Sequence, residues 1–357
     1  MRSKLWMTAV LGLATLPAFA QLAPAPAAST AKNLPAVVVS GALPGPGLWK
    51  VSKGDHVLWI LGTQSPLPEK MQWQSRQVEA TELAAQALLL PPAIEVNAKG
   101  GFFSKLLLLP RLIGIRDNPD GKKLVDVLPP SVYARWQALK ARYLGHGNGV
   151  EKFRPIFAAG KLYEAALKEA GLTDDDVAGK QVRKLAKQHD IPRISTSYTF
   201  TIADPKQALT EFRHGSMDDT ACLVQTMDRI EHDLPHMQAA ANAWATGDTD
   251  ALATLRRDRH GDACDDAFNG SDLARQQGLQ DVAAKVEQSW LKAADAALAK
   301  NRSTLALLPM GELLSPTGYL AQLKAQGYAV ASPDEQDDAP AAASSVAAPI
   351  ALGAAAR

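Results

Sequence analysis

The first strong pattern along the chain is a pair of apolar segments separated by a short polar cluster. Leu48–Ser52 and His56–Leu61 are rich in residues that favour strands, and Lys53-Gly54-Asp55 between them is typical of a turn. The pattern predicts a β-hairpin whose second strand is apolar along nearly all its length, as in a strand covered on both faces. That strand leads into Gly62-Thr63-Gln64-Ser65. In α/β sheets, ligands usually bind in the loop after a strand's carboxyl end.

Apolar residues at helical spacing recur through the middle of the chain. They predict helices over Gln72–Leu90, over Ser131–Ala170 with a break at Gly145–Gly149, over Val177–His189, in three pieces between Asp204 and Leu255, and over Gln276–Lys300. Pro91-Pro92 is expected to end the first, because proline neither donates a backbone hydrogen bond nor favours a helical residue before it. Asp233 is expected to cap a helix with Pro235 in its first turn, and Gly247-Asp248 to separate two helices.

The remaining segments alternate between strand-like and helix-like patterns. Arg193–Ser197 is strand-like, and so is Leu305–Leu308. The second of these is followed by Gly311-Glu312, a helical segment over Thr317–Ala325 and a last strand at Tyr328–Val330. We therefore predict an α/β (α+β) fold, with a mixed central sheet flanked by helices and a largely helical middle section.

The first residues have the composition of a Sec-type signal peptide. Arg2 and Lys4 precede an apolar run, and Ala18-Phe19-Ala20 follows it, so we expect cleavage after Ala20 and a periplasmic or secreted protein. The apolar run is shorter than the ~20 residues that cross a bilayer. We expect no transmembrane segment in the mature chain.

Two further segments contain too little apolar surface to offset the entropy of ordering the chain. Residues 21–34 are rich in Ala and Pro, and residues 332–357 run from an acidic cluster into an Ala-rich tail. We expect a disordered linker and a disordered tail on either side of one ordered domain over residues 35–331. Within that domain, the apolar run Phe102–Ile115 is too short to span a membrane, and we expect it either to be buried or to dock elsewhere.

Export changes the interpretation of the two cysteines, because thiols tend to pair in an oxidising compartment. We predict a Cys222–Cys264 disulfide, for which the chain-entropy model gives about 4 kcal/mol. A catalytic dithiol is the alternative, but the chain has no Cys-x-x-Cys spacing.

Overall charge gives no support for a nucleic-acid or anionic-lipid partner. The chain has 38 basic and 37 acidic residues. A balanced chain lacks the positive field that attracts phosphates. We therefore expect neither nucleic acid nor an anionic lipid surface as a partner.

Several motifs together resemble the TraB/GumN family over about Gly47–Val330. They are Leu48-Trp49-Lys50-Val51, the strand into Gly62-Thr63, Leu124–Pro129, Trp244-x-x-Gly247-Asp248, Gly318-Tyr319-Leu320 with Leu323, and Gly327-Tyr328-x-Val330. The resemblance implies an erythromycin-esterase-like, Tiki-like α/β fold. It also implies a relationship to secreted Tiki-type metalloproteases.

In such proteins, one strand ends in Gly-Thr-x-His and the last core strand in Gly-x-x-His. Imidazoles are needed there because they hold a metal that lowers the pKa of a bound water. The resemblance aligns the two histidines with Ser65 and Glu312, and the first glycine of the second motif with Pro309. The implied site positions are Gly62, Thr63, Ser65, Gly311 and Glu312, and both imidazoles are missing from them.

The resemblance also implies two acidic positions, which fall near Leu88–Leu90 and near Ser195-Thr196. Neither segment contains a carboxylate, and Glu95 would substitute only if the loop shifted its register. Serine is a poor ligand for a catalytic metal, and Glu312 alone is too few ligands. We therefore expect no cofactor and no confident catalytic residue. A divalent metal (Zn, Mn or Co) is expected only under a hydrolase hypothesis, with Glu312 as a ligand.

Other polar residues are weaker candidates. His232 and His236 lie one helical turn apart, but Pro235 and the missing glutamate base argue against a zinc helix. Ser65 lacks the Gly-x-Ser-x-Gly elbow of a serine nucleophile. The remaining residues are expected to be solvated: His214, His260, Asp218-Asp219 and Asp265-Asp266.

Three functional hypotheses follow. The first is an exported, non-catalytic or altered TraB/GumN-like protein that binds a protein, a peptide or an envelope component in the old cleft or at a nearby apolar surface. The second, from a different class, is a periplasmic metal-dependent hydrolase. The third is an accessory protein of envelope polysaccharide or secretion pathways.

Overall fold

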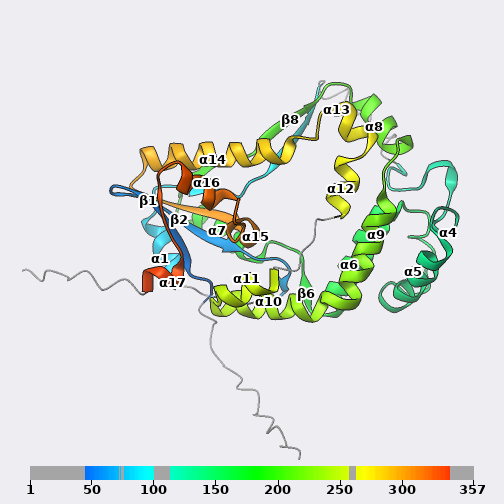
Figure 1. The fold of residues 1–357 in the computed structure, drawn as a ribbon, viewed down its shortest axis with the longest axis horizontal. Coiled ribbons are helices and arrows are strands. Elements are labelled where there is room, and N and C mark those ends of the chain that lie inside the picture. The colour runs from blue at the N-terminus through cyan, green and yellow to red at the C-terminus, as the bar shows by residue number, and fades with distance from the viewer. Residues whose placement is uncertain (1–44, 72, 74–75, 100–112, 257–262, 338–357) are drawn as a thin grey trace, which may run out of the picture. The chain divides into compact units, whose positions relative to one another are not determined.

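A computed structural model of the chain describes residues 45–71, 73, 76–99, 113–256 and 263–337 (Figure 1). The expected signal peptide and linker lie outside these ranges, as does most of the apolar run Phe102–Ile115. None of the helices in the described ranges combines the length and apolarity that crossing a bilayer requires.

The described residues form a mixed sheet in the order β10-β1-β2-β9-β4-β7, together with two small two-stranded sheets. The strands are β1 (Leu48–Lys53), β2 (His56–Thr63), β3 (Leu67–Pro68), β4 (Leu88–Leu89), β5 (Ile94–Ala98), β6 (Leu172–Thr173), β7 (Arg193–Ile194), β8 (Tyr198–Ile202), β9 (Ser303–Pro309) and β10 (Ala329–Ala331). β1 is antiparallel to both β2 and β10, whereas β2, β9, β4 and β7 are parallel to one another. The predicted mixed sheet and the β1–β2 hairpin are confirmed.

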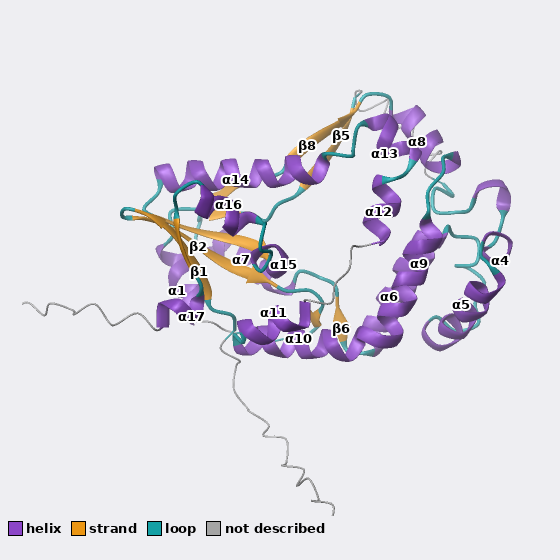
Figure 2. Ribbon diagram, in the orientation of Figure 1, coloured by secondary structure: helices purple, strands orange, loops and turns teal. Residues whose placement is uncertain are grey.

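The helices are α1 (Arg76–Ala84), α4 (Leu124–Val127), α5 (Pro130–Tyr143), α6 (Pro155–Glu169), α7 (Val177–Gln188), α8 (Pro205–His214), α9 (Asp219–Asp228), α10 (Leu234–Thr246), α11 (Thr249–Arg256), α12 (Ala263–Asn269), α13 (Asp272–Gln277), α14 (Val282–Lys300), α15 (Met310–Leu313), α16 (Tyr319–Ala325) and α17 (Pro333–Asp337). A 3₁₀ turn covers Pro119–Gly121, and a π-helical turn covers Arg229–Asp233. Figure 2 shows helices on both sides of the strands and a largely helical middle section, as predicted.

The central strand of the parallel part is β9, whose residues Leu305–Leu308 are completely buried. The long helix α14 contacts β2, β4 and β9, and it buries Trp290, Leu291 and Ala294 in the main core (Figure 1). A strand that is apolar on both faces needs such cover because neither face can remain in water.

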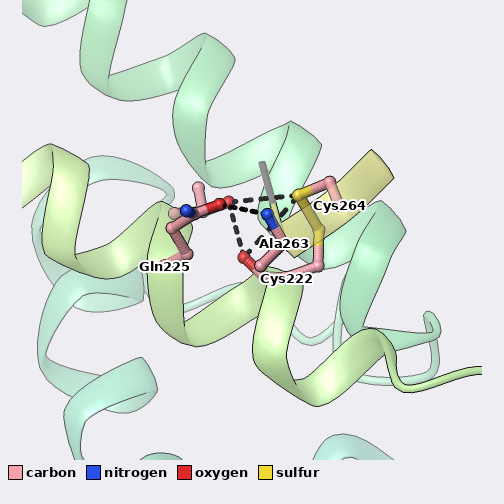
Figure 3. Close-up of a disulfide and its surroundings, with 5 residues drawn as sticks. Cys222, Gln225, Ala263 and Cys264 are labelled. Carbon is pink, nitrogen blue, oxygen red and sulfur yellow. Dashed lines mark hydrogen bonds between the residues drawn. A yellow bond between two sulfur atoms is a disulfide. The ribbon is translucent and has the colours of Figure 1, made fainter. Parts of the chain in front are cut away.

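The helical middle section has a core of its own. It contains Trp136, Leu162, Leu223 and Met227, all completely buried, from α5, α6 and α9. The Cys222–Cys264 disulfide, which the sequence predicted, joins α9 to the start of α12. Beside the disulfide, the side-chain oxygen of Gln225 accepts a hydrogen bond of 2.7 Å from the backbone N–H of Ala263 (Figure 3).

Several predicted boundaries were wrong. The helix expected over Gln72–Leu90 stops at Ala84, and Leu88–Leu89 form β4 instead, because they pair with both β9 and β7. The helix expected from Gln276 begins at Val282, since Gly278 ends α13 in the left-handed conformation. Asp233 does not cap a helix, because the chain passes from α9 through a π-helical turn into α10.

Other local predictions were correct. Pro235 lies in the first turn of α10, and Gly247 ends that helix in the left-handed conformation. The side chain of Asp248 then accepts a hydrogen bond from the N–H of Ala251 and so caps α11. In contrast to the disordered tail expected from Ser332, Pro333–Asp337 form α17, and Gln336 donates a hydrogen bond to the carbonyl oxygen of Leu48.

Candidate functional site

The carboxyl ends of the parallel strands form the edge at which the sequence placed the candidate site. In the register of β2 and β9, Gly62 lies beside Leu308 and Thr63 beside Pro309. α15, which carries Gly311 and Glu312, follows β9 directly. The fold therefore brings the loop after β2 and the loop after β9 to one edge, as the resemblance implied.

Gly62 is required by close packing at this edge. A Cβ atom at Gly62 would lie 2.5 Å from Cε of Met310 and 2.8 Å from Cδ1 of Leu313. The carbonyl oxygen of Gly62 accepts a hydrogen bond of 2.7 Å from Nε1 of the buried Trp244. Both contacts fix the end of β2 against its neighbours, so Gly62 has a role in packing.

Ser65 is bound to the loop that precedes α7. Its hydroxyl donates to the carboxylate of Asp174 at 2.7 Å and lies 3.0 Å from the carbonyl oxygen of the same residue. The neighbouring Gln64 is buried and donates to the carbonyl oxygen of Ser65. The position aligned with the first histidine therefore holds two loops together.

The two positions at which the resemblance implies carboxylates also have structural roles. Leu88 and Leu89 are completely buried in β4. The hydroxyl of the buried Thr196 lies 3.2 Å from the carbonyl oxygen of Leu90 and 2.7 Å from that of Pro91. Glu95 lies in β5 with an exposed side chain, paired in register with Thr199 of β8. None of these residues presents a carboxylate to the sheet edge beside Glu312.

Glu312 borders a cavity of about 510 Å³ at the sheet edge, which is also lined by Pro92, Pro309, Glu287 and Tyr319. Burial, and then the negative charges of Glu312 and Glu287, raise the pKa of the Tyr319 hydroxyl. The hydroxyl thus stays neutral, and two carboxylates face the same small volume. Glu287 also accepts a hydrogen bond of 2.5 Å from the amide of Gln322.

This donor set does not fit the catalytic metal that the resemblance implies. A catalytic zinc site normally has three protein ligands from imidazole, thiolate or carboxylate groups. The cavity supplies carboxylates from Glu312 and Glu287 only, and Ser65 does not line it. Within the described ranges, no group of three or more His, Cys, Asp or Glu side chains lies close enough together to hold a metal ion.

A larger cavity of about 780 Å³ lies next to this edge. Its walls come from β5, β8, α8, α12, α13 and the start of α14, and Ala283 of α14 lines both cavities. The lining is mostly apolar: Ile94, Val96, Phe200, Leu209, Phe212 and Phe268 are among its residues. Val96 is 55% exposed and Ile94 44% exposed, so this apolar surface is accessible to a ligand.

The β5–β8 pair explains why the cavity is apolar. In register, Ile94 pairs with Tyr198 and Val96 with Phe200, so their side chains share one face of the pair. The opposite face carries Asn97 and other polar residues. Both strands alternate strictly in sequence, Ile-Glu-Val-Asn-Ala and Tyr-Thr-Phe-Thr-Ile. Sequence reasoning missed this pair, although the period-two alternation was a visible signal.

The other histidine candidates within the described residues do not line these cavities. His232 and His236 are exposed near the π-helical turn, and His214 is exposed in the last turn of α8. His260 lies outside the described residues. The prediction of a solvated Asp218-Asp219 turn was wrong for Asp219, which is buried and receives a hydrogen bond of 3.0 Å from Nε of Arg154.

Asp265 and Asp266 are exposed, as predicted, but they lie in the first turn of α12 and not in an isolated turn. Carboxylates are favoured at that end of a helix by the partial positive charge of the unpaired N–H groups. Asp265 in addition lines the apolar cavity.

Comparison with known proteins identifies the family. A model of the TraB/PrgY/gumN family matches residues 47–332, which include all six strands of the main sheet and the helical middle section. No curated protein and no solved structure gives a significant match to the chain.

Proposed function

The chain belongs to the TraB/PrgY/gumN family, and from that premise we propose that it is an exported binding protein whose sheet edge no longer supports metal chemistry. The proposal is motivated by the use of the aligned positions in structural hydrogen bonds and packing. Ser65 binds Asp174, Thr196 binds two backbone carbonyl oxygens, and Leu89 is in the core. These groups are not available to coordinate an ion.

The ligand that fits best is a long-chain fatty acid bound in the apolar cavity. The single observation that carries this proposal is the volume of about 780 Å³ with a mostly apolar, partly exposed lining. Small-molecule sites commonly have roughly 300–1,000 Å³ and similar linings. Burying an acyl chain there would stabilise the complex by about 25 cal/mol for each Å² of apolar surface removed from water.

The charges around the cavity favour one orientation of this ligand. Nζ of Lys285 lies 5.8 Å from the ring centroid of Tyr198, which is the register partner of Ile94 in the cavity wall. Asp265, on the α12 wall, would repel a carboxylate. The fatty-acid carboxylate is therefore placed towards Lys285, with the acyl chain running along the apolar face of β5 and β8.

Two adjacent residues of β5 provide a matched test. Val96→Lys introduces an ammonium into the cavity wall, whereas Asn97→Lys introduces the same charge on the opposite face of the strand. We expect Val96→Lys to weaken the binding of cis-parinaric acid by about tenfold or more, because an ammonium next to an acyl chain is desolvated without a partner. Asn97→Lys should bind as tightly as the unmodified chain. Fluorescence titration of the full chain measures both affinities.

Equal loss of affinity in the two variants would point to a general charge effect and would contradict the cavity as the binding site. A folded chain that does not bind the fatty acid at all would overturn the proposed ligand. Circular dichroism of both variants checks that the fold is intact.

A second candidate function is a metal-dependent hydrolase, and one observation favours it. Glu287 and Glu312 both line the cavity of about 510 Å³ at the sheet edge, beside the Tyr319 hydroxyl. Two carboxylates provide the start of an oxygen-donor site that suits manganese better than zinc. This candidate requires further ligands and a metal-dependent turnover, whereas the binding protein requires neither.

A further inference from the structure

The α12 wall of the apolar cavity buries little surface of its own. α12 contributes Asp265, Phe268 and Asn269 to the lining of the cavity of about 780 Å³. Among the residues of this described helix, Ala267 is the one that is buried. Because the stabilisation from burial scales with the apolar area removed from water, one alanine contributes little to holding α12 in place.

The first turn of α12 carries the strongest attachment of this wall. There Cys264 is bonded covalently to Cys222 of α9, and the side chain of Cys222 is completely buried in the core of the helical section (Figure 3). At the same turn, the backbone N–H of Ala263 donates its hydrogen bond of 2.7 Å to the side chain of Gln225. The disulfide therefore connects one wall of the cavity directly to the buried face of α9.

The other end of α12 is held by groups that do not depend on the disulfide. The hydroxyl of Ser271 donates a hydrogen bond of 2.6 Å to the carbonyl oxygen of Phe268. The backbone N–H and the hydroxyl of Ser216 donate to the carboxylate of Asp272 at 2.7 and 2.9 Å, and α13 then packs against α8. Breaking the disulfide would thus release the first turn of α12 and leave α13 and α8 in place.

We propose that the Cys222–Cys264 disulfide positions the α12 wall, so that the fatty-acid affinity of the apolar cavity depends on the oxidation state of the two cysteines. This role rests on the proposed function, because it concerns the same cavity. Neither cysteine lines the cavity, so both are positioning residues. In the oxidised chain, Phe268 contacts the acyl chain. In the reduced chain, α12 moves away and that part of the acyl chain returns to water.

The chemical step is a thiol–disulfide exchange with an external dithiol. A thiolate of the dithiol attacks one cysteine sulfur, the S–S bond breaks, and a mixed disulfide forms. The second thiol of the dithiol then displaces the remaining cysteine. Cys222 and Cys264 together gain two electrons and two protons, and the dithiol becomes a cyclic disulfide.

The test is fluorescence titration of the full chain with cis-parinaric acid before and after treatment with dithiothreitol. We expect the reduced chain to bind about tenfold more weakly, since losing the cover of one phenyl ring removes apolar contact area from the complex. The variant with Cys222→Ser and Cys264→Ser should bind as weakly as the reduced chain, and dithiothreitol should not change its affinity.

Phe268→Ala on α12 and Leu209→Ala on α8 form a matched pair, because both residues line the cavity and only α12 carries the disulfide. Phe268→Ala should weaken binding in the oxidised chain and have no further effect in the reduced chain. Leu209→Ala should weaken binding by the same factor in both states. A general loss of stability would not produce this difference between the two walls.

Equal affinities of the oxidised and reduced chains would overturn the role of the disulfide, and so would an effect of Phe268→Ala that is the same in both states. Circular dichroism of the reduced chain should remain that of a folded protein. Loss of its helical signal would contradict the proposal, which requires a local release of α12. Absence of binding by the oxidised chain would instead overturn the proposed function, and this role with it.

Discussion

Replacing Glu151 with alanine is expected to lower the free energy of unfolding by about 3–5 kcal/mol, since the change leaves a buried charge without its partner. Nζ of Lys140 lies 2.8 Å from Oε1 of Glu151, and both side chains are almost completely buried. Nε1 of Trp136 and Nε2 of Gln137 donate to the same oxygen at 3.2 and 3.0 Å. Alanine would leave the Lys140 ammonium and the Trp136 N–H unpaired in the helical core.

Chemical denaturation of the full chain measures this effect, and an exposed ion pair provides the control. Arg142 and Glu169 form a pair of 3.2 Å in which both side chains are about half exposed. Glu169→Ala should cost less than about 1 kcal/mol, because exposed pairs are screened by water. Similar losses in Glu151→Ala and Glu169→Ala would contradict the assigned role of the buried network.

The Glu151 network also predicts a pH dependence. Burial alone would raise the pKa of Glu151, but the hydrogen bonds from Lys140, Trp136 and Gln137 and the charge of Lys140 lower it below its ordinary value of 4.5. A carboxyl with a lowered folded-state pKa contributes stability above its unfolded pKa and loses it as the pH falls through the folded value. The difference between Glu151→Ala and the unmodified chain should therefore shrink below about pH 4.5.

Removing the disulfide is the second change that we expect to lower the free energy of unfolding by a large amount. The chain-entropy model gives about 4 kcal/mol for a loop of this length. The bond is the covalent link between α9, where Cys222 is completely buried, and α12, which follows the undescribed residues 257–262. We expect Cys222→Ser with Cys264→Ser to lower the free energy of unfolding by about 2–4 kcal/mol.

Denaturation with and without a reducing agent checks this expectation. The reducing agent should destabilise the unmodified chain to a similar extent and leave the double-serine variant unchanged. A double-serine variant as stable as the oxidised chain would show that the cross-link contributes nothing to the helical section.

Local signals in the sequence were sufficient to predict much of the fold. Lys53-Gly54-Asp55 between two apolar runs predicted the β1–β2 hairpin, and the apolar run Leu305–Leu308 predicted the buried β9. The Cys222–Cys264 bond followed from the count of two cysteines and the expected compartment. These features depend on composition and short-range pattern, which one sequence displays directly.

Features that depend on distant partners were not predicted. Leu88 and Leu89 have good helix propensity, and only their pairing with β9 and β7 makes them a strand.

The candidate site could likewise be predicted only in part. The two motifs that the resemblance compares lie after β2 and after β9, and the parallel pairing of these strands brings both loops to one edge of the sheet. The resemblance did not indicate that Ser65 binds Asp174 or that Thr196 binds the carbonyl oxygens after β4. Those bonds join residues that are far apart in the sequence, and only the folded chain brings them together.

The most direct test of the account is the metal dependence of the purified, folded full chain. We predict that, after incubation with zinc, manganese or cobalt and removal of free ions, elemental analysis finds well below one ion per chain. Replacing Glu312 with alanine should not change that value or any activity on peptides. One tightly bound ion per chain, with a turnover that chelators abolish and that Glu312→Ala removes, would contradict the account.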